Sequence, residues 1–113
     1  MHELGLADAM LKMVDKVVKE EHLTEVNSVT IEIGDLSGVV PHFMSDCWEA
    51  VVDRTPYQKT ELIIKTAPGT LRCEDCQSVF LADLDHLSCP NCGGKKLTPL
   101  TGRDMTILEI EAC

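Results

Sequence analysis

The chain has 113 residues, of which 19 are acidic and 10 are basic, so its formal net charge is −9 at pH 7. Clustered Lys and Arg are needed to bind a phosphate backbone, and this acidic balance argues against a nucleic-acid partner. No apolar run approaches the roughly 20 residues that cross a bilayer, and the start of the chain lacks the pattern of an export signal. We therefore expect a small cytoplasmic protein in a reducing compartment.

Apolar residues recur at three- and four-residue steps between positions 4 and 18, which predicts a helix with one buried face. The members of this face are Leu4, Ala7, Met10, Leu11, Val14, Val17 and Val18. Asp8 lies four residues before Lys12, in the order that stabilises an exposed helix surface. His22 follows the periodic stretch, and we expect it at the helix C-terminus, where the helix dipole favours it, and not in a metal site.

A strand and a second helix follow. Val29, Ile31 and Ile33 alternate with polar residues, which predicts a half-buried strand that ends at Gly34. Pro41 suits the first turn of a helix, which we expect to end at Thr55-Pro56. The apolar face of this second helix is predicted to contain Phe43, Met44, Cys47, Trp48, Val51 and Val52. On that face Cys47 is interpreted as a small buried apolar residue.

Two further strands are predicted near the middle and the end of the chain. Residues 62–64 form a short apolar run, and residues 105–111 carry Ile107, Leu108 and Ile110. Since a single strand is not stable alone, we expect the last strand to pair with those near positions 29 and 62. The segment between them is then an insertion. Cys113 at the end is predicted to be a loose, oxidisable thiol.

That insertion contains the most specific motif, Cys73-Glu74-Asp75-Cys76 followed by Cys89-Pro90-Asn91-Cys92. Two Cys-x-x-Cys turns in one short segment predict a tetrahedral zinc site. Iron or a disulfide pair is the alternative, which the reducing compartment and the paired turns disfavour. Because four thiolates fill the coordination shell, the zinc is expected to fold the segment and not to catalyse a reaction.

A second metal site is conceivable at Met1-His2-Glu3. An α-amine, the His2 amide and a His2 ring nitrogen can chelate one ion, with the Glu3 amide or another histidine as a fourth ligand. Ni²⁺ and Cu²⁺ accept such all-nitrogen ligation. On the residues alone, however, a histidine at an exposed terminus usually has no such role. His86 is interpreted as an exposed loop residue, and His42 would reach the N-terminus only if the fold brings the two together.

Several motifs occur together in one order: Met1-His2-Glu3-Leu4, then Ile33-Gly34-Asp35-Leu36-Ser37, then the paired cysteines, then a strand up to Ile110-Glu111. In this order they resemble the HypA/HybF family of hydrogenase maturation factors, nickel metallochaperones that load the active site of nickel-iron hydrogenases. The resemblance covers essentially the whole chain. The family often has Phe or Glu in the stretch where this chain has Ser45-Asp46-Cys47-Trp48. This difference affects the expected partner surface and not the metal sites.

The resemblance implies a fold, ligands and partners. The fold is α+β, with two helices packed on a three-stranded sheet and an inserted four-cysteine zinc ribbon. Residues 1–68 and 102–113 would form the nickel-binding α/β domain, and residues 69–101 the ribbon. The nickel ligands of the family correspond to Met1, His2 and Glu3, and the ligands of its structural zinc correspond to Cys73, Cys76, Cys89 and Cys92. The implied partners are a GTPase accessory maturation protein, a hydrogenase large-subunit precursor and, in some organisms, urease maturation proteins.

Two other functions compete with a non-enzymatic nickel carrier. A zinc-ribbon adaptor would make protein contacts without nickel transfer, and a dithiol redox protein would use the cysteine pairs. An enzyme is not predicted, because the sequence shows no Ser/His/Asp or Cys/His nucleophile arrangement and no phosphate-binding glycine loop.

Overall fold

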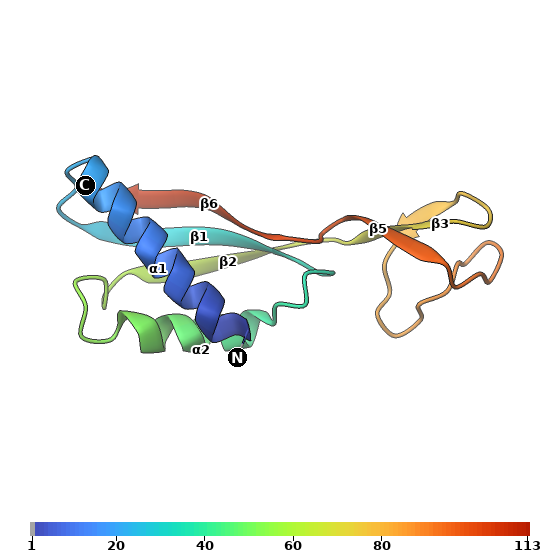
Figure 1. The fold of residues 1–113 in the computed structure, drawn as a ribbon, viewed down its shortest axis with the longest axis horizontal. Coiled ribbons are helices and arrows are strands. Elements are labelled where there is room, and N and C mark those ends of the chain that lie inside the picture. Colours follow the sequence, from blue (N-terminus) through green and yellow to red (C-terminus); the bar gives the residue numbers. More distant parts are fainter. Residues whose placement is uncertain (1) are drawn as a thin grey trace. The chain divides into compact units, whose positions relative to one another are not determined.

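A computed structural model describes residues 2–113 of the chain. The described residues form two helices and two three-stranded sheets, ordered β2-β1-β6 and β4-β3-β5 (Figure 1). The elements are α1 (His2–Glu20), β1 (Val26–Gly34), α2 (Pro41–Val52), β2 (Glu61–Ala67), β3 (Thr70–Cys73), β4 (Val79–Leu81), β5 (Leu97–Thr101) and β6 (Met105–Ala112). The α+β fold predicted from the sequence, with its inserted ribbon, is confirmed.

β1 is the central strand of the first sheet. Near its end, the Gly34 amide donates to the Asp104 carbonyl at 3.0 Å. Just before its start, the Glu25 carbonyl accepts from the Cys113 amide at 2.9 Å. The end of β1 therefore lies beside the start of β6, so the two strands run antiparallel. This pairing confirms that the last strand returns to the first sheet.

β2 lies on the other side of β1 and runs in the same direction. At the start of both strands, Thr60 Oγ1 donates to the Val26 carbonyl at 2.8 Å. Beyond the end of β1, the Asp35 amide donates to the Ala67 carbonyl at 2.9 Å. Parallel neighbours need a crossover connection, and α2 supplies it, so β1, α2 and β2 form a β-α-β unit.

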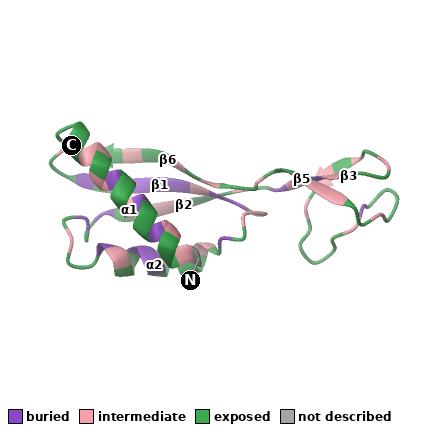
Figure 2. Cartoon of the chain, in the orientation of Figure 1, coloured by how far each residue is buried: buried purple, intermediate pink, exposed green. Residues whose placement is uncertain are grey.

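The core of the first sheet lies against the two helices, and β1 is buried along most of its length (Figure 2). Its buried apolar residues include Ala7, Met10 and Val14 from α1, Val29, Ile31 and Ile33 from β1, and Met44, Cys47, Trp48 and Val52 from α2. Cys47 is thus buried as predicted. Leu4 and Phe43, which were predicted to be buried, are exposed, because each lies in the first turn of its helix, at the end of the apolar stripe.

The ends of the helices differ in detail from the prediction. His22 follows α1 with a φ of 55°, in the left-handed region that glycine usually occupies just after a helix. The Leu23 amide donates to the Val18 carbonyl at 3.0 Å, which closes the end of the helix. α2 ends at Val52, earlier than predicted. Cys113 is a free, exposed thiol, as predicted, but the chain there is not loose, because the backbone amide and carbonyl of Cys113 are both hydrogen bonded in the extension of β6.

The chain forms two compact units. The first runs to Glu32 and continues through Val39–Lys65 and Thr106–Cys113. The second contains Ile33–Gly38 and Thr66–Met105. The four cysteines of the paired turns all lie in the second unit.

Within the second unit, three glycines allow chain segments to cross closely. A Cβ on Gly34 would overlap the Gly102 carbonyl, and a Cβ on Gly102 would lie 2.7 Å from Gly69 Cα. Gly102 also has a φ of +70°, which favours glycine. At the same crossing, the Leu36 amide donates to the Gly102 carbonyl at 2.8 Å. The Gly34-Asp35-Leu36 turn is therefore bonded to both segments that lead into and out of the ribbon.

Candidate metal centre

The two Cys-x-x-Cys turns have the same backbone design. In the first, the Gln77 amide donates to the Cys73 carbonyl at 2.8 Å, and in the second the Gly93 amide donates to the Cys89 carbonyl at 2.8 Å. The residue after each second cysteine has a positive φ, 63° at Gln77 and 75° at Gly93. This left-handed residue turns the chain so that both sulfurs of a pair face the same point.

A second hydrogen bond closes each turn. The Cys73 amide donates to the Ser78 carbonyl at 2.9 Å, and the Cys89 amide donates to the Gly94 carbonyl at 2.8 Å. β3 ends at Cys73 and pairs with β4 on one side and β5 on the other. The first turn is thus held between two strands, and the second lies in the loop that leads to β5.

The turns bring the four sulfurs together. All four Sγ atoms lie within 4.8 Å of one another, and among the described side chains, those of residues 3–113, no other group of three or more His, Cys, Asp or Glu ligand atoms gathers in this way. Cys73 and Cys92 Sγ are 3.6 Å apart, and Cys76 and Cys89 Sγ are 3.5 Å apart. Four sulfurs at about 2.3 Å from a tetrahedral zinc lie about 3.8 Å from one another. The arrangement therefore fits a tetrahedral ion, and an S₄ donor set is typical of zinc or iron.

Backbone amides are directed at the sulfurs of the second turn. Cys89 Sγ accepts from the amides of Asn91 at 3.4 Å and Cys92 at 3.5 Å. Cys92 Sγ accepts from the Gly94 amide at 3.4 Å. Such contacts orient metal-bound thiolates and spread their negative charge. They are therefore suited to sulfur in its ionised, metal-binding form.

Hydrogen bonds shift the pKa values of two of the four thiols, Cys76 and Cys92. Hydrogen bonds with Ser78 and Asn91 lower the pKa of Cys76 to about 6. The Gly94 amide favours the ionised form of Cys92, but the hydrogen bonds shared with Cys73 and Cys76 outweigh it and raise the pKa of Cys92 to about 12. Thiolates this close repel one another, and a bound cation would compensate their charge.

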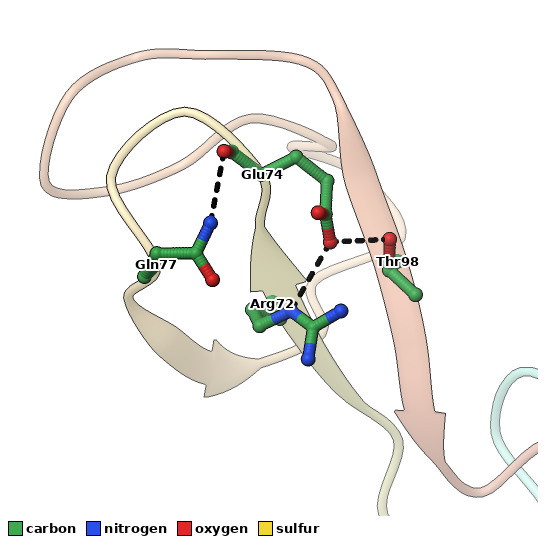
Figure 3. Close-up of polar contacts among 4 residues, drawn as sticks. All are labelled: Arg72, Glu74, Gln77 and Thr98. Carbon is green, nitrogen blue, oxygen red and sulfur yellow. Dashed lines mark hydrogen bonds and ion pairs between the residues drawn. The ribbon is translucent and has the colours of Figure 1, made fainter.

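A network on Glu74 joins the first turn to β5 (Figure 3). Glu74 Oε1 accepts from Thr98 Oγ1 at 2.6 Å and from Arg72 Nε at 3.1 Å. The Glu74 carbonyl accepts from Gln77 Nε2 at 3.0 Å, and the Glu74 amide donates to the Lys96 carbonyl at 2.9 Å. Thr98, and then Arg72, lower the pKa of the Glu74 carboxyl. No local pattern in the sequence indicates this role, because Thr98 is distant from Glu74 along the chain.

The residues predicted to bind nickel are less fully described. Met1 and the side chain of His2 lie outside the described part of the structure, whereas α1 begins at His2. Glu3 is half-buried in the first turn of α1. His42 Nε2 lies 3.5 Å from Asp46 Oδ2, and His86 Nδ1 lies 3.4 Å from Asp83 Oδ2. Both histidines are largely exposed, as expected for His86, and neither is part of the cysteine cluster.

Neither described helix is both long enough and apolar enough to cross a membrane.

Comparison with known sequences identifies one family. The family described as "Hydrogenase/urease nickel incorporation, metallochaperone, hypA" matches residues 1–112. The hydrogenase maturation factor HypA of Albidiferax ferrireducens is 38% identical over 112 residues, covering 98% of each chain. The HypA of Streptomyces avermitilis is 33% identical over 112 residues, covering 97% of this chain and 86% of its own.

Solved structures share the fold. The solution structure of the Ni metallochaperone HypA from Helicobacter pylori superposes with a TM-score of 0.67 at 21% identity, covering 97% of this chain and 96% of its own. A second structure, described as a solution structure of HypA protein, has a TM-score of 0.70 at 23% identity and covers 100% of this chain and 97% of its own. Both confirm the arrangement of helices and strands.

Proposed function

Because the chain belongs to the HypA family of hydrogenase and urease nickel-incorporation metallochaperones, we propose that it binds Ni(II) at its N-terminus and delivers the ion for maturation of nickel-iron hydrogenase. The proposed ligands are Met1, His2 and Glu3. The observation that carries the proposal is a Met-His-Glu start that leads directly into α1, in a chain of this family. The nickel is cargo, and the chain acts as a carrier and not as an enzyme.

The position of His2 at the start of α1 supports this ligand set. The α-amine of Met1 and the backbone nitrogens of His2 and Glu3 are consecutive along the chain, so Ni²⁺ can bind the amine together with deprotonated amide nitrogens in adjacent chelate rings. The α-amine of Met1 and the imidazole of His2 complete chelate rings around the ion, and an all-nitrogen set of this kind suits Ni²⁺.

The cysteine cluster has a different role in this proposal. Cys73, Cys76, Cys89 and Cys92 bind zinc, which is the tetrahedral S₄ ion without redox chemistry. Four thiolates leave no open coordination position, so the zinc stabilises the ribbon and is not transferred.

The two metal sites are assigned to different domains, and the nickel is passed to partner proteins. We place nickel binding in an α/β domain of residues 1–68 and 102–113 and zinc in a ribbon domain of residues 69–101. The nickel passes, in the cytoplasm, to a GTPase accessory maturation protein and a hydrogenase large-subunit precursor, and in some organisms to urease maturation proteins. Ligand exchange at a labile terminal site makes this transfer possible, because protons compete with the metal for the amine and the imidazole.

The test is metal content by elemental analysis on protein with a free Met1 α-amine, as isolated and after nickel equilibration and desalting. We expect one zinc in the isolated protein and one additional nickel after equilibration. His2→Ala should lose the nickel and keep the zinc. His42→Ala and His86→Ala are matched controls, since both remove an exposed histidine and should retain nickel.

Acetylation of the Met1 α-amine should also abolish nickel binding, because it converts this amine into an amide and supplies no new amine. Nickel affinity should fall as the pH drops through the imidazole range near about 6.5. Nickel retained by His2→Ala would refute the N-terminal site. Zinc without retained nickel in any variant would instead favour the zinc-ribbon adaptor.

A further inference from the structure

The ribbon carries a group of exposed aliphatic side chains. Val79 and Leu81 of β4 are 60% and 69% exposed, and Leu84 and Leu87 in the following loop are 62% and 53% exposed. We name these four residues the ribbon patch. Single exposed apolar residues are common, but four large ones along one short stretch mark a surface that a partner covers.

The backbone of β4 is also available for pairing. β4 is an edge strand, because β3 is its single neighbour in the sheet. The Ser78 carbonyl accepts from the Cys73 amide at the end of β3, and the Ala82 amide donates to the Gly69 carbonyl just before β3. Between these two bonds, Phe80 lies opposite Leu71. Alternate residues of a strand direct their N–H and C=O groups to opposite sides. The backbone groups of Val79 and Leu81 therefore point away from β3, where another extended chain can bond to them.

A cavity of about 240 Å³ lies beside Leu81. Its lining residues are Phe80, Leu81, Asp83, His86, Ser88 and Pro90. Its volume is several times the roughly 30 Å³ that one water occupies in the liquid. A side chain of a bound segment can enter this cavity while the backbone of the segment pairs with β4.

The charge around the ribbon patch selects the partner. Glu74, Asp75, Asp83 and Asp85 lie between Cys73 and Cys92, and this segment contains no Lys or Arg. Arg72, just before it, offsets the charge of Glu74, so the three aspartates carry the negative field. The Asp85 amide donates to Asp83 Oδ1 at 3.0 Å, which fixes the acidic turn beside the cavity. If the cysteines bind zinc as proposed, four thiolates on one Zn²⁺ add two negative charges. A basic segment is favoured by this field, and an acidic one is repelled.

We propose that the outer edge of β4 and the ribbon patch bind an extended segment of a partner protein in which aliphatic and basic residues alternate. The segment adds a strand to β4 and places an aliphatic side chain in the cavity beside Leu81. A second copy of this chain fits poorly, because pairing would bring two ribbon segments of the same negative charge close to each other. An anionic lipid surface is disfavoured for the same reason. The proposal does not depend on nickel binding.

The test uses the full-length, zinc-loaded, ¹⁵N-labelled protein and a capped hexapeptide of alternating lysine and valine. We expect the amide signals of Val79 and Leu81 to shift on titration, and the affinity to fall as salt is raised. Leu81→Ser should weaken binding by about tenfold. Leu108→Ser is the matched control, because Leu108 is 49% exposed on β6, and this variant should bind as the wild type does.

Two altered peptides test the mode of binding. A peptide with glutamate in place of lysine should not bind. A peptide with proline at a central position lacks one N–H and cannot complete a strand, so it should bind at least about tenfold more weakly. Equal binding of the acidic peptide would overturn the charge argument, and unchanged binding of the proline peptide would overturn strand addition. Shifts at Val79 on raising the protein concentration without peptide would assign the surface to a second copy and refute the proposal.

Discussion

Tyr57 donates a hydrogen bond of 2.6 Å from its hydroxyl to Asp15 Oδ1. The other oxygen of this carboxylate lies 2.8 Å from Lys19 Nζ. Lys19, and then Tyr57, lower the pKa of the Asp15 carboxyl. Burial, followed by the bond to Asp15, raises the pKa of Tyr57 to about 12. This contact ties α1 to the turn between α2 and β2, and it holds a buried tyrosine in its neutral form.

We expect Tyr57→Phe to lower the free energy of unfolding by about 1 kcal/mol at pH 7, because the hydrogen bond to a half-exposed carboxylate is lost while the ring stays packed. Urea unfolding followed by Trp48 fluorescence measures this change. Lys12→Ala is the control: it removes an exposed ion pair with Asp8, which should be worth less than about 0.5 kcal/mol. A loss no larger than that in the control would contradict the role of the hydrogen bond.

The same contact predicts a dependence on alkaline pH. A group whose pKa is raised by folding stabilises the folded state fully below its unfolded pKa, here near about 10, and loses this contribution as the pH rises through the folded pKa. Wild-type stability should therefore fall from pH 10 to about 12 by more than that of Tyr57→Phe. Tyr57 is the one tyrosine in the chain, so phenolate absorbance titrates it directly. A midpoint near 10 in the folded protein would refute the shift.

The glycines offer a graded comparison. Gly102→Ala should lower the free energy of unfolding by at least about 2 kcal/mol, since it adds an overlap with Gly69 and Pro68 to a φ of +70°. Gly38→Ala should cost about 1 kcal/mol, because its φ is +79° but the space is open. Gly5→Ala, inside α1 with open space, should stabilise the protein by about 0.5–1 kcal/mol. Denaturant unfolding of the three variants tests this order, and equal costs at Gly102 and Gly38 would contradict the close approach.

Local patterns allowed much of the fold to be predicted. The 3.6-residue period located α1 and α2, and the two-residue period located β1, because each period reflects contacts with a neighbouring layer. The spacing of the paired cysteines predicted the metal centre, since two residues between ligands are enough to define a turn. The return of β6 to β1 followed from the need of an isolated strand for a partner.

Contacts between distant segments could not be predicted in this way. Nothing near Glu74 in the sequence points to Thr98, and nothing near Gly34 points to Gly102, because these contacts form only when two strands are already side by side. Phe43 has the spacing of a buried residue, but the period cannot show where the covering layer ends. The nickel ligands were inferred from the resemblance to a family and not from periodicity, and they stay a prediction.

Gly94 should control the metal affinity of the ribbon. A Cβ at this position would lie 3.3 Å from the Sγ atoms of both Cys73 and Cys92, and 2.7 Å from Asp75 Oδ2. The Asp75 side chain can rotate away, but metal-bound sulfurs cannot. We expect Gly94→Ala to weaken zinc binding by about 10- to 100-fold, the range found when the surroundings of ligands are disturbed. Competition with a chromophoric zinc chelator measures the change.

The neighbouring glycine supplies the control for this experiment. Gly93 has open space around its Cβ position, and Gln77 occupies the equivalent place in the first turn with a similar positive φ. Gly93→Gln should therefore weaken zinc binding by about fivefold, which corresponds to about 1 kcal/mol, the lower end of the strain of one left-handed residue. A greater loss for Gly93→Gln than for Gly94→Ala would show that backbone strain, and not contact with the sulfurs, limits the site.

Removal of the metal should unfold the ribbon and leave the first unit intact. Trp48 is buried and donates from Nε1 to the Thr60 carbonyl at 3.2 Å within the first unit, so its fluorescence should not change on treatment with a chelator.

Thiol titration provides the second readout. Cys113 is exposed and should react at once, the four ribbon cysteines should react only after chelation, and Cys47 should react only in denaturant because it is buried in the core. Cys113→Ser identifies the rapid thiol. Reaction of Cys47 on chelation alone would show that the metal also stabilises the first unit, and rapid reaction of the ribbon thiols without chelator would show that no metal protects them.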